Sequence, residues 1–285
     1  MDKGVINNPK AWEELLARAA GGLEVRTDSR AVNPGEIFVA IPGTKSDGAR
    51  FVPMALERGA AYVVASASAG LGPVSGAALV TCDDPRAALG ELAAARFGTA
   101  SLPFPLCGVT GTNGKTTVAY LLEHLIRENG GRAGVLGTVE YRWPGHAEEA
   151  SLTTPDCLKV HSMLAAMAAA GVTGAVMEAS SHALDQGRVA GLAFDAAVLT
   201  NVTQDHLDYH GGMDDYFAAK RLLFTHYLKD PAGAVINFDD PRGRELLDAM
   251  PEAVGYGLGD EGVPAHALRG RILSQSGQGM ELEVS

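Results

Sequence analysis

Residues 105–129 read PLCGVTGTNGKTTVAYLLEHLIREN, and this stretch combines the features that decide the fold. Pro105 to Val109 form an apolar run suited to a buried strand, and Thr110 to Thr117 form a tight loop. Gly130 and Gly131 end the helix that follows, because glycine adopts the left-handed conformation common after a last helical turn. The apolar residues of this helix recur at helical spacing and predict one buried face: Val118, Leu121, Leu122, Leu125 and Ile126.

A strand, a glycine loop, a lysine and a helix in this order predict a phosphate-binding loop. Glycines let backbone N–H groups surround phosphate oxygens, and the helix N-terminus adds partial positive charge. In this arrangement Lys115 can reach the outer phosphates of a bound ligand, and the Thr116 hydroxyl can hold Mg²⁺. Val109 stands where the usual G-x-x-x-x-G-K-[ST] pattern has a glycine, so a plain glycine turn with a surface lysine is the alternative.

Length and composition indicate a globular chain with two domains. The chain has 285 residues, of which 46% are hydrophobic and 20% are charged. The net charge of −11 argues against binding to nucleic acid or to an acidic membrane surface. Local groups, rather than the overall field, must therefore hold any anionic ligand.

Cysteine usage and the N-terminal sequence indicate the compartment. Cys82, Cys107 and Cys157 are far apart and form no C-x-x-C motif, which is typical of a reducing environment. The N-terminus MDKGVINNPK does not have the pattern of a signal peptide, and no apolar run is long enough for a membrane helix. We therefore expect a cytoplasmic protein with no membrane partner. We also expect a monomer and, from the net charge, no nucleic-acid partner.

The order of predicted elements indicates an α/β fold in two parts. Residues 1–98 alternate helices and strands as a small N-terminal α/β domain, and residues 99–285 follow a βαβ rhythm with a mostly parallel sheet. The helix after Thr153 has Thr154 as its predicted cap and Pro155 at its first position. The predicted helices are 11–20, 51–58, 84–97, 154–170 and 214–228, and the predicted strands are 37–41, 61–65, 77–80, 132–139, 174–177, 196–200, 234–238 and 280–284.

Polar residues follow two of these strands directly. Glu178 comes after the strand at 174–177, and Asn201 comes after the strand at 196–200, with His206 shortly beyond it. Ligands of parallel sheets bind at the carboxyl ends of the strands, so we expect these side chains near the phosphate loop. A glutamate at the end of a strand is sometimes only the neighbour of a helix cap, and a lone histidine is more often a structural group than a ligand.

The loop GTNGKTT resembles the ATP-binding loop of the Mur ligase family, which includes the peptidoglycan amino-acid ligases and the folylpolyglutamate synthases. The segments MEASSHAL and NVTQDHLDYH resemble the tripeptide-forming, MurE-type branch of that family. Folylpolyglutamate synthases lack a first domain of the kind seen here. The matching residues of the first domain are Asp28-Ser29-Arg30, Gly35, Ile37-Phe38-Val39-Ala40, Gly43, Asp47-Gly48 and Phe51.

This resemblance implies an ATP-dependent amide ligase of cytoplasmic peptidoglycan precursor synthesis. The enzyme would add a diamino acid, meso-diaminopimelate or L-lysine, to UDP-MurNAc-L-Ala-D-Glu through an acyl phosphate, with ATP and Mg²⁺. The metal ligands implied are Thr116, Glu178, His206 and a carbamylated Lys220, and with Lys115 the last three would be the catalytic residues. Which diamino acid is added remains open at this point.

The resemblance also assigns the two nucleotide sites residue by residue. The ATP contacts would be Gly111, Thr112, Asn113, Gly114, Lys115, Thr116, Thr117 and Asn201. The uridine diphosphate and muramoyl-peptide contacts would be Thr27, Ser29, Thr44, Lys45, Ser46, Thr153, Thr154, Ser180, Gln186 and Arg188.

Lys220 supports two interpretations. It lies on the apolar face of the predicted helix at 214–228, four residues after Tyr216, and most such lysines extend their amine to water. In the resembled family the equivalent lysine is carbamylated. Burial would lower its pKa and leave a neutral amine able to react with CO₂.

Family members continue beyond the point where this sequence stops, on the strand before Ser285. The resemblance therefore implies that the ATP-binding domain is incomplete and that the amino-acid-binding C-terminal domain is absent. We expect the 285-residue chain to bind substrate without completing ligation. The alternatives are a Mur ligase that adds D-Ala-D-Ala, a folate-polyglutamylating enzyme, and a nucleotide-binding protein without turnover, and substrate binding distinguishes them.

Overall fold

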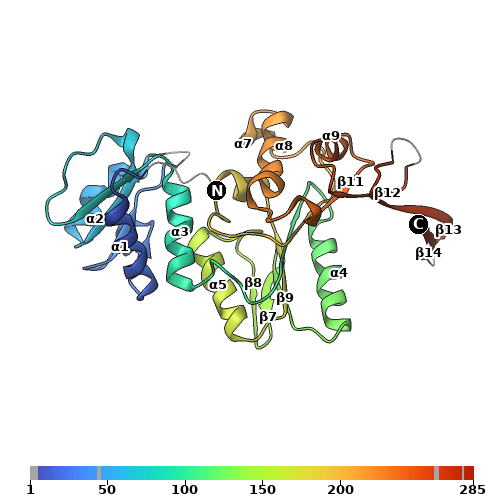
Figure 1. The fold of residues 1–285 in the computed structure, drawn as a ribbon, viewed down its shortest axis with the longest axis horizontal. Helices are drawn as coiled ribbons and strands as arrows, with labels where there is room; N and C mark the ends of the chain where they lie inside the picture. The colour runs from blue at the N-terminus through green and yellow to red at the C-terminus, as the bar shows by residue number, and fades with distance from the viewer. Residues whose placement is uncertain (1–5, 44–45, 260–262, 278) are drawn as a thin grey trace. The chain divides into compact units, whose positions relative to one another are not determined.

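The computed structural model describes residues 6–43, 46–259, 263–277 and 279–285. They form two compact units. The first unit consists of the described residues within the ranges 1–102, 156–166 and 186–192. The second unit consists of the described residues within the ranges 103–155, 167–185 and 193–285. Each unit has a mainly parallel sheet with helices, so the predicted α/β class is confirmed (Figure 1).

Within its described residues, the first unit has a four-stranded parallel sheet in the order β1-β2-β3-β4. The strands are β1 (Val25–Arg26), β2 (Ile37–Val39), β3 (Tyr62–Ser66) and β4 (Ala78–Cys82). The helices are α1 (Pro9–Ala20), α2 (Val52–Glu57) and α3 (Pro85–Phe97), with 3₁₀ turns at Ser29–Ala31, Gly48–Phe51 and Ala67–Ala69.

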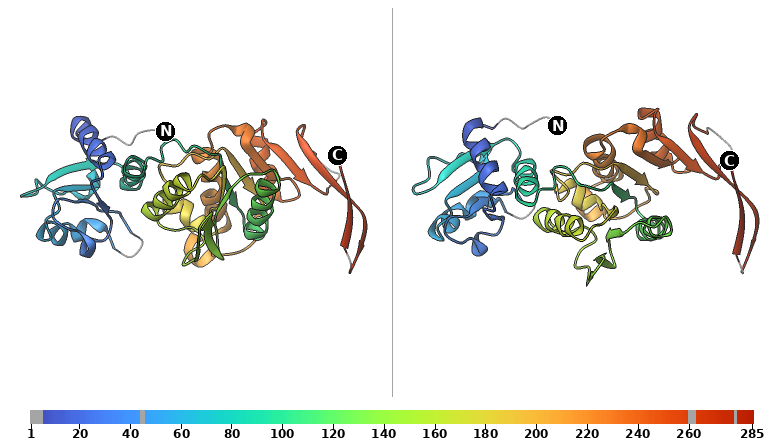
Figure 2. Two further views of the ribbon diagram at one scale, coloured as in Figure 1. Left: turned by 90° about the horizontal axis from the view of Figure 1, so that it is seen from below. Right: turned by 60° about the horizontal axis from the view of Figure 1, so that its bottom comes forward.

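Apolar packing and a helix cap hold the first unit together. Helices α1 and α3 pack side by side (Figure 2), with Trp12, Leu15 and Leu92 buried in the core they share with the sheet. Asp84 caps α3 and Pro85 occupies its first position, as the sequence predicts. The burial of these large side chains supplies the apolar surface that stabilises a unit of this size.

The second unit has, in the part that the structure describes, a ten-stranded sheet in the order β14-β13-β12-β11-β10-β5-β9-β6-β7-β8. The strands from β12 to β6 in that order run parallel, as expected, whereas β7 and β8 are antiparallel additions at one edge. The strands are β5 (Leu106–Thr110), β6 (Ala133–Leu136), β7 (Glu140–Trp143), β8 (His146–Glu149), β9 (Gly174–Glu178), β10 (Ala196–Leu199), β11 (Ala234–Asn237), β12 (Val254–Gly257), β13 (Ala267–Ser276) and β14 (Gly279–Val284).

Helix α4 follows the phosphate loop and packs against β5, β6 and β9 (Figure 1). Figure 1 also shows α8 and α9 among the connections of the second unit. The remaining helices are α5 (Cys157–Ala169), whose residues up to 166 belong to the first unit, α6 (Ser181–Asp185), α7 (Leu207–His210), α8 (Met213–Leu222) and α9 (Pro241–Ala249), and α4 itself spans Lys115–Glu128.

The predicted buried face of α4 is partly wrong. Leu121 and Leu125 are 58% and 55% exposed, whereas Glu123 is buried. Glu123 accepts charge-assisted hydrogen bonds from Arg142 on β7, and it also pairs with Arg127 one turn further along the helix. A charged residue therefore takes a buried position that an apolar pattern does not reveal, because its partners compensate the cost of removing the charge from water.

Three further elements differ from the sequence predictions. The β7–β8 hairpin was not predicted, because its residues are largely polar. A strand at the edge of a sheet, such as β8, does not need the alternation of apolar and polar residues by which strands are recognised in a sequence. Helix α5 begins at Cys157, and Asp156 accepts from the Lys159 N–H at 3.0 Å, so Thr154 is not the cap. Helix α8 is shorter than predicted, because a π-helical turn replaces its last turn at Leu223–Tyr227.

The hairpin of β13 and β14 extends away from the rest of the second unit (Figures 1 and 2). Its apolar side chains are exposed on both faces: Leu268, Ile272, Leu273, Met280, Leu282 and Val284. The strand predicted at 280–284 lies within β14. Among the described residues, no helix is both long and apolar enough to cross a membrane.

Candidate active site

The phosphate loop lies between β5 and α4 in the conformation that its glycines require. Gly111 and Gly114 have φ angles of +143° and +86°, and α4 begins at Lys115 directly after Gly114. A Cβ at Gly111 would overlap Thr200 Oγ1, so no other residue fits there. The loop thus leads directly into the N-terminus of α4, where the partial positive charge of the helix suits a phosphate group.

Lys115 and Lys220 both donate to the same backbone carbonyl. Lys115 Nζ donates to Gly111 O and Thr112 O, each at 2.9 Å, and Lys220 Nζ donates to Gly111 O at 2.8 Å. Lys220 is only 1% exposed and lies over the Tyr216 ring, so the expectation of an amine in solvent was wrong. Burial, and then the charge of Lys115, lower the pKa of Lys220 to about 7.

The Glu178 carboxylate lies at the end of β9, fully buried, beside the loop hydroxyl. Its Oε2 accepts from Thr116 Oγ1 at 3.1 Å and from Thr138 Oγ1 at 2.9 Å, and its Oε1 accepts from the Thr138 N–H at 3.0 Å. A Cβ at Gly137 would overlap Glu178 Oε1, so this glycine provides the space for the carboxylate. These oxygen atoms are the hard ligands that Mg²⁺ prefers, and the donor set therefore fits that ion.

Thr138 is a site residue that the sequence interpretation missed. It follows β6, next to β9 in the sheet, and the rule that ligands bind at strand ends would have found it. Thr138 Oγ1 also lies 3.2 Å from Thr153 Oγ1, from which it can accept while it donates to Glu178. Thr154 Oγ1 donates to the Glu178 carbonyl at 2.7 Å and accepts from the Ser180 N–H at 3.1 Å, so the structure brings these predicted residues to Glu178.

Asn201 and Thr200 hold the phosphate loop from the end of β10. The Asn201 side chain accepts from the Asn113 N–H at 3.0 Å and donates to the Asn113 carbonyl at 3.1 Å. Thr200 Oγ1 donates to the same carbonyl at 2.7 Å. In this geometry Asn201 supports the loop that was predicted to contact ATP.

His206 lies beside Asp205, with its ring near those of His182 and Tyr216. Among the described residues other than glycine, His206 alone has a positive φ, of +51°. Its side chain is half exposed. No three His, Cys, Asp or Glu side chains of the described ranges form a ready metal centre. His210 is buried, its Nε2 lies 3.0 Å from Ser181 Oγ, and burial lowers its pKa.

In the first unit, a cavity of about 300 Å³ brings together segments that are far apart in the sequence. The predicted substrate residue Ser29 is not among the residues that line this cavity: it is buried and donates to Met54 Sδ at 3.3 Å. Thr44 and Lys45 lie outside the described residues, and Ser46 is described with its carbonyl accepting from the Gly43 N–H. Three predicted substrate residues line the cavity, Thr27, Gln186 and Arg188, together with Ile41, Pro42, Gly43, Arg86, Leu89, Asp156, Cys157 and Gly187.

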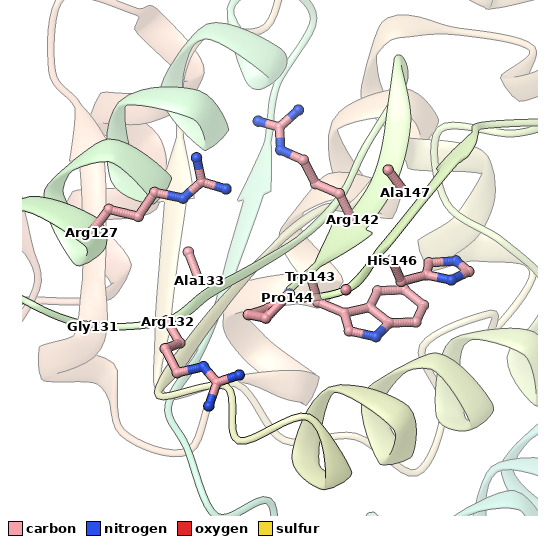
Figure 3. Close-up of a pocket in the computed structure, with 10 residues that line it drawn as sticks. Arg127, Gly131, Arg132, Ala133, Arg142, Trp143, Pro144, His146 and Ala147 are labelled. Carbon is pink, nitrogen blue, oxygen red and sulfur yellow. The ribbon is translucent and has the colours of Figure 1, made fainter.

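A second cavity, of about 600 Å³, lies beside the start of β6 and the turn between β7 and β8. Its lining includes Arg127, Arg132 and Arg142 (Figure 3). Glu123 compensates two of these charges, and the start of β6 is the end of the strand opposite to Thr138. This cavity is therefore separate from the phosphate loop.

A glycine loop at the carboxyl edge of a parallel sheet places the second unit in the class of phosphate-binding α/β domains. Family comparison defines the group more narrowly. Residues 24–97 match the Mur ligase family catalytic domain, and residues 109–285 match the Mur ligase middle domain. The chain belongs to the Mur ligase family.

Individual relatives point to one branch of this family. A UDP-N-acetylmuramoyl-L-alanyl-D-glutamate–2,6-diaminopimelate ligase of Lawsonia intracellularis is 47% identical over 259 residues, which cover 90% of this chain and 54% of the relative. The ligase of the same name from Synechococcus elongatus is 46% identical over 232 residues, which cover 80% and 46%. The chain therefore spans about half the length of these curated relatives.

Solved structures of Mur ligases have the same fold as this chain. A structure of a ligase with that name aligns with a TM-score of 0.75 at 32% identity, covering 91% of this chain and 53% of the other. MurF from Acinetobacter baumannii aligns with a TM-score of 0.56 at 21% identity, covering 95% and 59%, which shows a shared fold.

Proposed function

We propose that this chain carries the two nucleotide-binding parts of an ATP-dependent ligase of peptidoglycan precursor synthesis. The ligase adds a diamino acid to UDP-MurNAc-L-Ala-D-Glu, and the names of the relatives favour diaminopimelate over L-lysine. The observation that carries the proposal is the buried Glu178 carboxylate, which contacts the Thr116 hydroxyl of the phosphate loop. The enzyme works in the cytoplasm as a monomer.

The proposed division of labour follows the two domains. Residues 1–98 bind the uridine diphosphate end of the substrate, and residues 99–285 bind ATP. Thr27, Gln186 and Arg188 contact the substrate from the cavity in the first unit, which supports this assignment. Thr44 and Lys45, which lie outside the described residues, are assigned to the same substrate by the family resemblance.

Mg²⁺ would be held by Thr116, Thr138 and Glu178, with His206 and a carbamylated Lys220 as ligands of a second ion, and it would neutralise phosphate charge. Lys115 orients the outer phosphates of ATP. The D-glutamyl carboxylate attacks the γ-phosphate and releases ADP, and the amine of the diamino acid then displaces phosphate from the acyl phosphate.

Substrate-binding calorimetry on the 285-residue chain tests the proposal. We expect binding of UDP-MurNAc-L-Ala-D-Glu, and no binding of a folate. Binding of the UDP-MurNAc-tripeptide but not of the dipeptide would instead show a ligase that adds D-Ala-D-Ala. Binding of a folate in place of either sugar nucleotide would show a folate-polyglutamylating enzyme.

A further inference from the structure

Arg86 lies where two separate segments of the first unit meet. It occupies the first turn of α3, where Asp84 Oδ1 accepts from the Arg86 and Ala87 N–H groups at 2.8 and 3.2 Å. This cap fixes the start of the helix, and with it the point from which the Arg86 side chain extends.

The guanidinium group of Arg86 holds the base of the loop between Ile41 and Gly48. Its Nη2 donates a hydrogen bond of 2.8 Å to the Pro42 carbonyl. The Gly48 N–H donates to the Ile41 carbonyl at 3.0 Å and closes the loop next to this contact. The predicted substrate residue Ser46 belongs to the described part of the same loop, so the position of the loop base matters for binding.

The aliphatic stem of Arg86 contacts a second segment. Gly187 lies between Gln186 and Arg188 and has a left-handed φ of +65°. A Cβ at Gly187 would lie 3.1 Å from Arg86 Cβ and 3.4 Å from Arg86 Cδ, so the stem lies against this backbone. One side chain therefore contacts both the loop and the turn that carries two predicted substrate residues.

These contacts lie around the cavity of about 300 Å³. Its charged lining consists of Arg86, Arg188 and Asp156, so guanidinium groups outnumber carboxylates in a chain whose net charge is −11. A guanidinium has five N–H donors, and Arg86 can hold the Pro42 carbonyl while it faces an anionic oxygen. This lining suits a ligand with a phosphate group.

We propose that Arg86 is a positioning residue for the phosphate-bearing end of the UDP-linked substrate. It holds the loop at Pro42 and the turn at Gly187 in the geometry that binds this ligand. The inference rests on the function proposed above for the first unit. It also requires Arg86 to hold the base of the loop, at Pro42, before any ligand binds.

Hydrogen exchange of the ligand-free chain tests this requirement. In Arg86→Ala the Gly43 and Gly48 amides, which close the loop, should exchange about 10-fold faster, since one charge-assisted hydrogen bond is lost. Arg58→Ala is the matched control, because Arg58 Nε donates to the Val32 carbonyl at 3.0 Å in the same unit. Equal exchange in wild type and Arg86→Ala would overturn the proposal.

Calorimetry with UDP-MurNAc-L-Ala-D-Glu then tests the consequence for binding. Arg86→Ala should weaken binding about 10-fold or more, and Arg86→Lys should restore part of it, because lysine still donates to the Pro42 carbonyl. Affinity for ATP with Mg²⁺ should not change in either variant. Arg58→Ala should leave both affinities unchanged.

The outcomes separate this inference from the function on which it rests. If wild type does not bind the UDP-linked substrate, the proposed function fails and the role of Arg86 fails with it. If wild type and Arg86→Ala bind it equally, only the role of Arg86 fails. If Arg86→Ala weakens ATP binding as well, or Arg86→Lys restores nothing, Arg86 is merely structural and the inference is overturned.

Discussion

Two lysines that share one carbonyl create the main electrostatic conflict of the site. Lys115 and Lys220 both donate to Gly111 O, so two ammonium groups would lie close together in a buried place. A pKa of about 7 for Lys220 relieves this conflict, because its amine is then largely neutral near neutral pH. A carbamate on Lys220 would replace the repulsion with attraction toward Lys115.

We predict that Lys220 forms a carbamate with CO₂. Its neutral fraction rises through pH 7, so ¹³C NMR of the chain in ¹³C-bicarbonate should show a carbamate signal that is stronger at pH 8 than at pH 6. Lys229 is the matched control, because it is half exposed and pairs with Asp195. A signal that persists in Lys220→Ala, or disappears in Lys229→Ala, would contradict the assignment.

The buried His161 should make the free energy of unfolding depend on pH. His161 is fully buried beside Thr99 Oγ1 and the Ala190 carbonyl, and burial lowers its pKa to about 4 from 6.5. Between these values the unfolded chain binds a proton that the folded chain does not. The free energy of unfolding should therefore fall by about 3 kcal/mol as pH falls from 6.5 to 4.

Denaturant unfolding of His161→Gln at several pH values measures this contribution. The variant should lose this part of the pH dependence, whatever its stability at pH 7. His124→Gln, at an exposed position on α4, should keep the wild-type slope. Parallel slopes for wild type and His161→Gln would show that His161 does not titrate as its burial implies.

Among the elements, the end of β6 determines where the Glu178 carboxylate lies. Gly137→Ala should displace the carboxylate from Thr116 and Thr138, because the added Cβ would overlap Glu178 Oε1. Affinity for ATP with Mg²⁺ should fall about 10-fold, the usual effect of disturbing groups around a metal, whereas affinity in EDTA should not change.

Gly72→Ala is the control for this experiment, since a Cβ at Gly72 meets open space. Calorimetric titration of a non-hydrolysable ATP analogue into each variant, with Mg²⁺ and with EDTA, gives the four affinities. An unchanged ratio of affinities in Gly137→Ala would show that this edge of the sheet does not form the metal site.

The sequence predicts the elements whose signals are local. The phosphate loop needs glycines at fixed positions, and most of the parallel strands are apolar runs, so the loop and these strands were predicted correctly. The parallel strands β1, β12 and β13 were not predicted, because their residues do not form a continuous apolar run. The exposed side of α4 and the β7–β8 hairpin were not predicted. Both depend on the contact between Glu123 and Arg142, which are 19 residues apart, and a periodic pattern contains no information about such a pair.

At the scale of the whole molecule, the candidate sites need residues from distant segments. Glu178 is 62 residues from Thr116, and Arg86 is 44 residues from Pro42. Family resemblance assigned Glu178 because it lies in a motif. Thr138 and Arg86 lie outside the quoted motifs, so only the folded structure reveals their contacts.

The presence of two distinct nucleotide sites in one chain is the central claim. UDP-MurNAc-L-Ala-D-Glu should be titrated calorimetrically into the 285-residue chain already saturated with a non-hydrolysable ATP analogue and Mg²⁺. We predict that one equivalent binds without displacing the analogue, and that Lys115→Ala removes binding of the analogue alone. Displacement of one nucleotide by the other would contradict the claim, because it would show a single shared site.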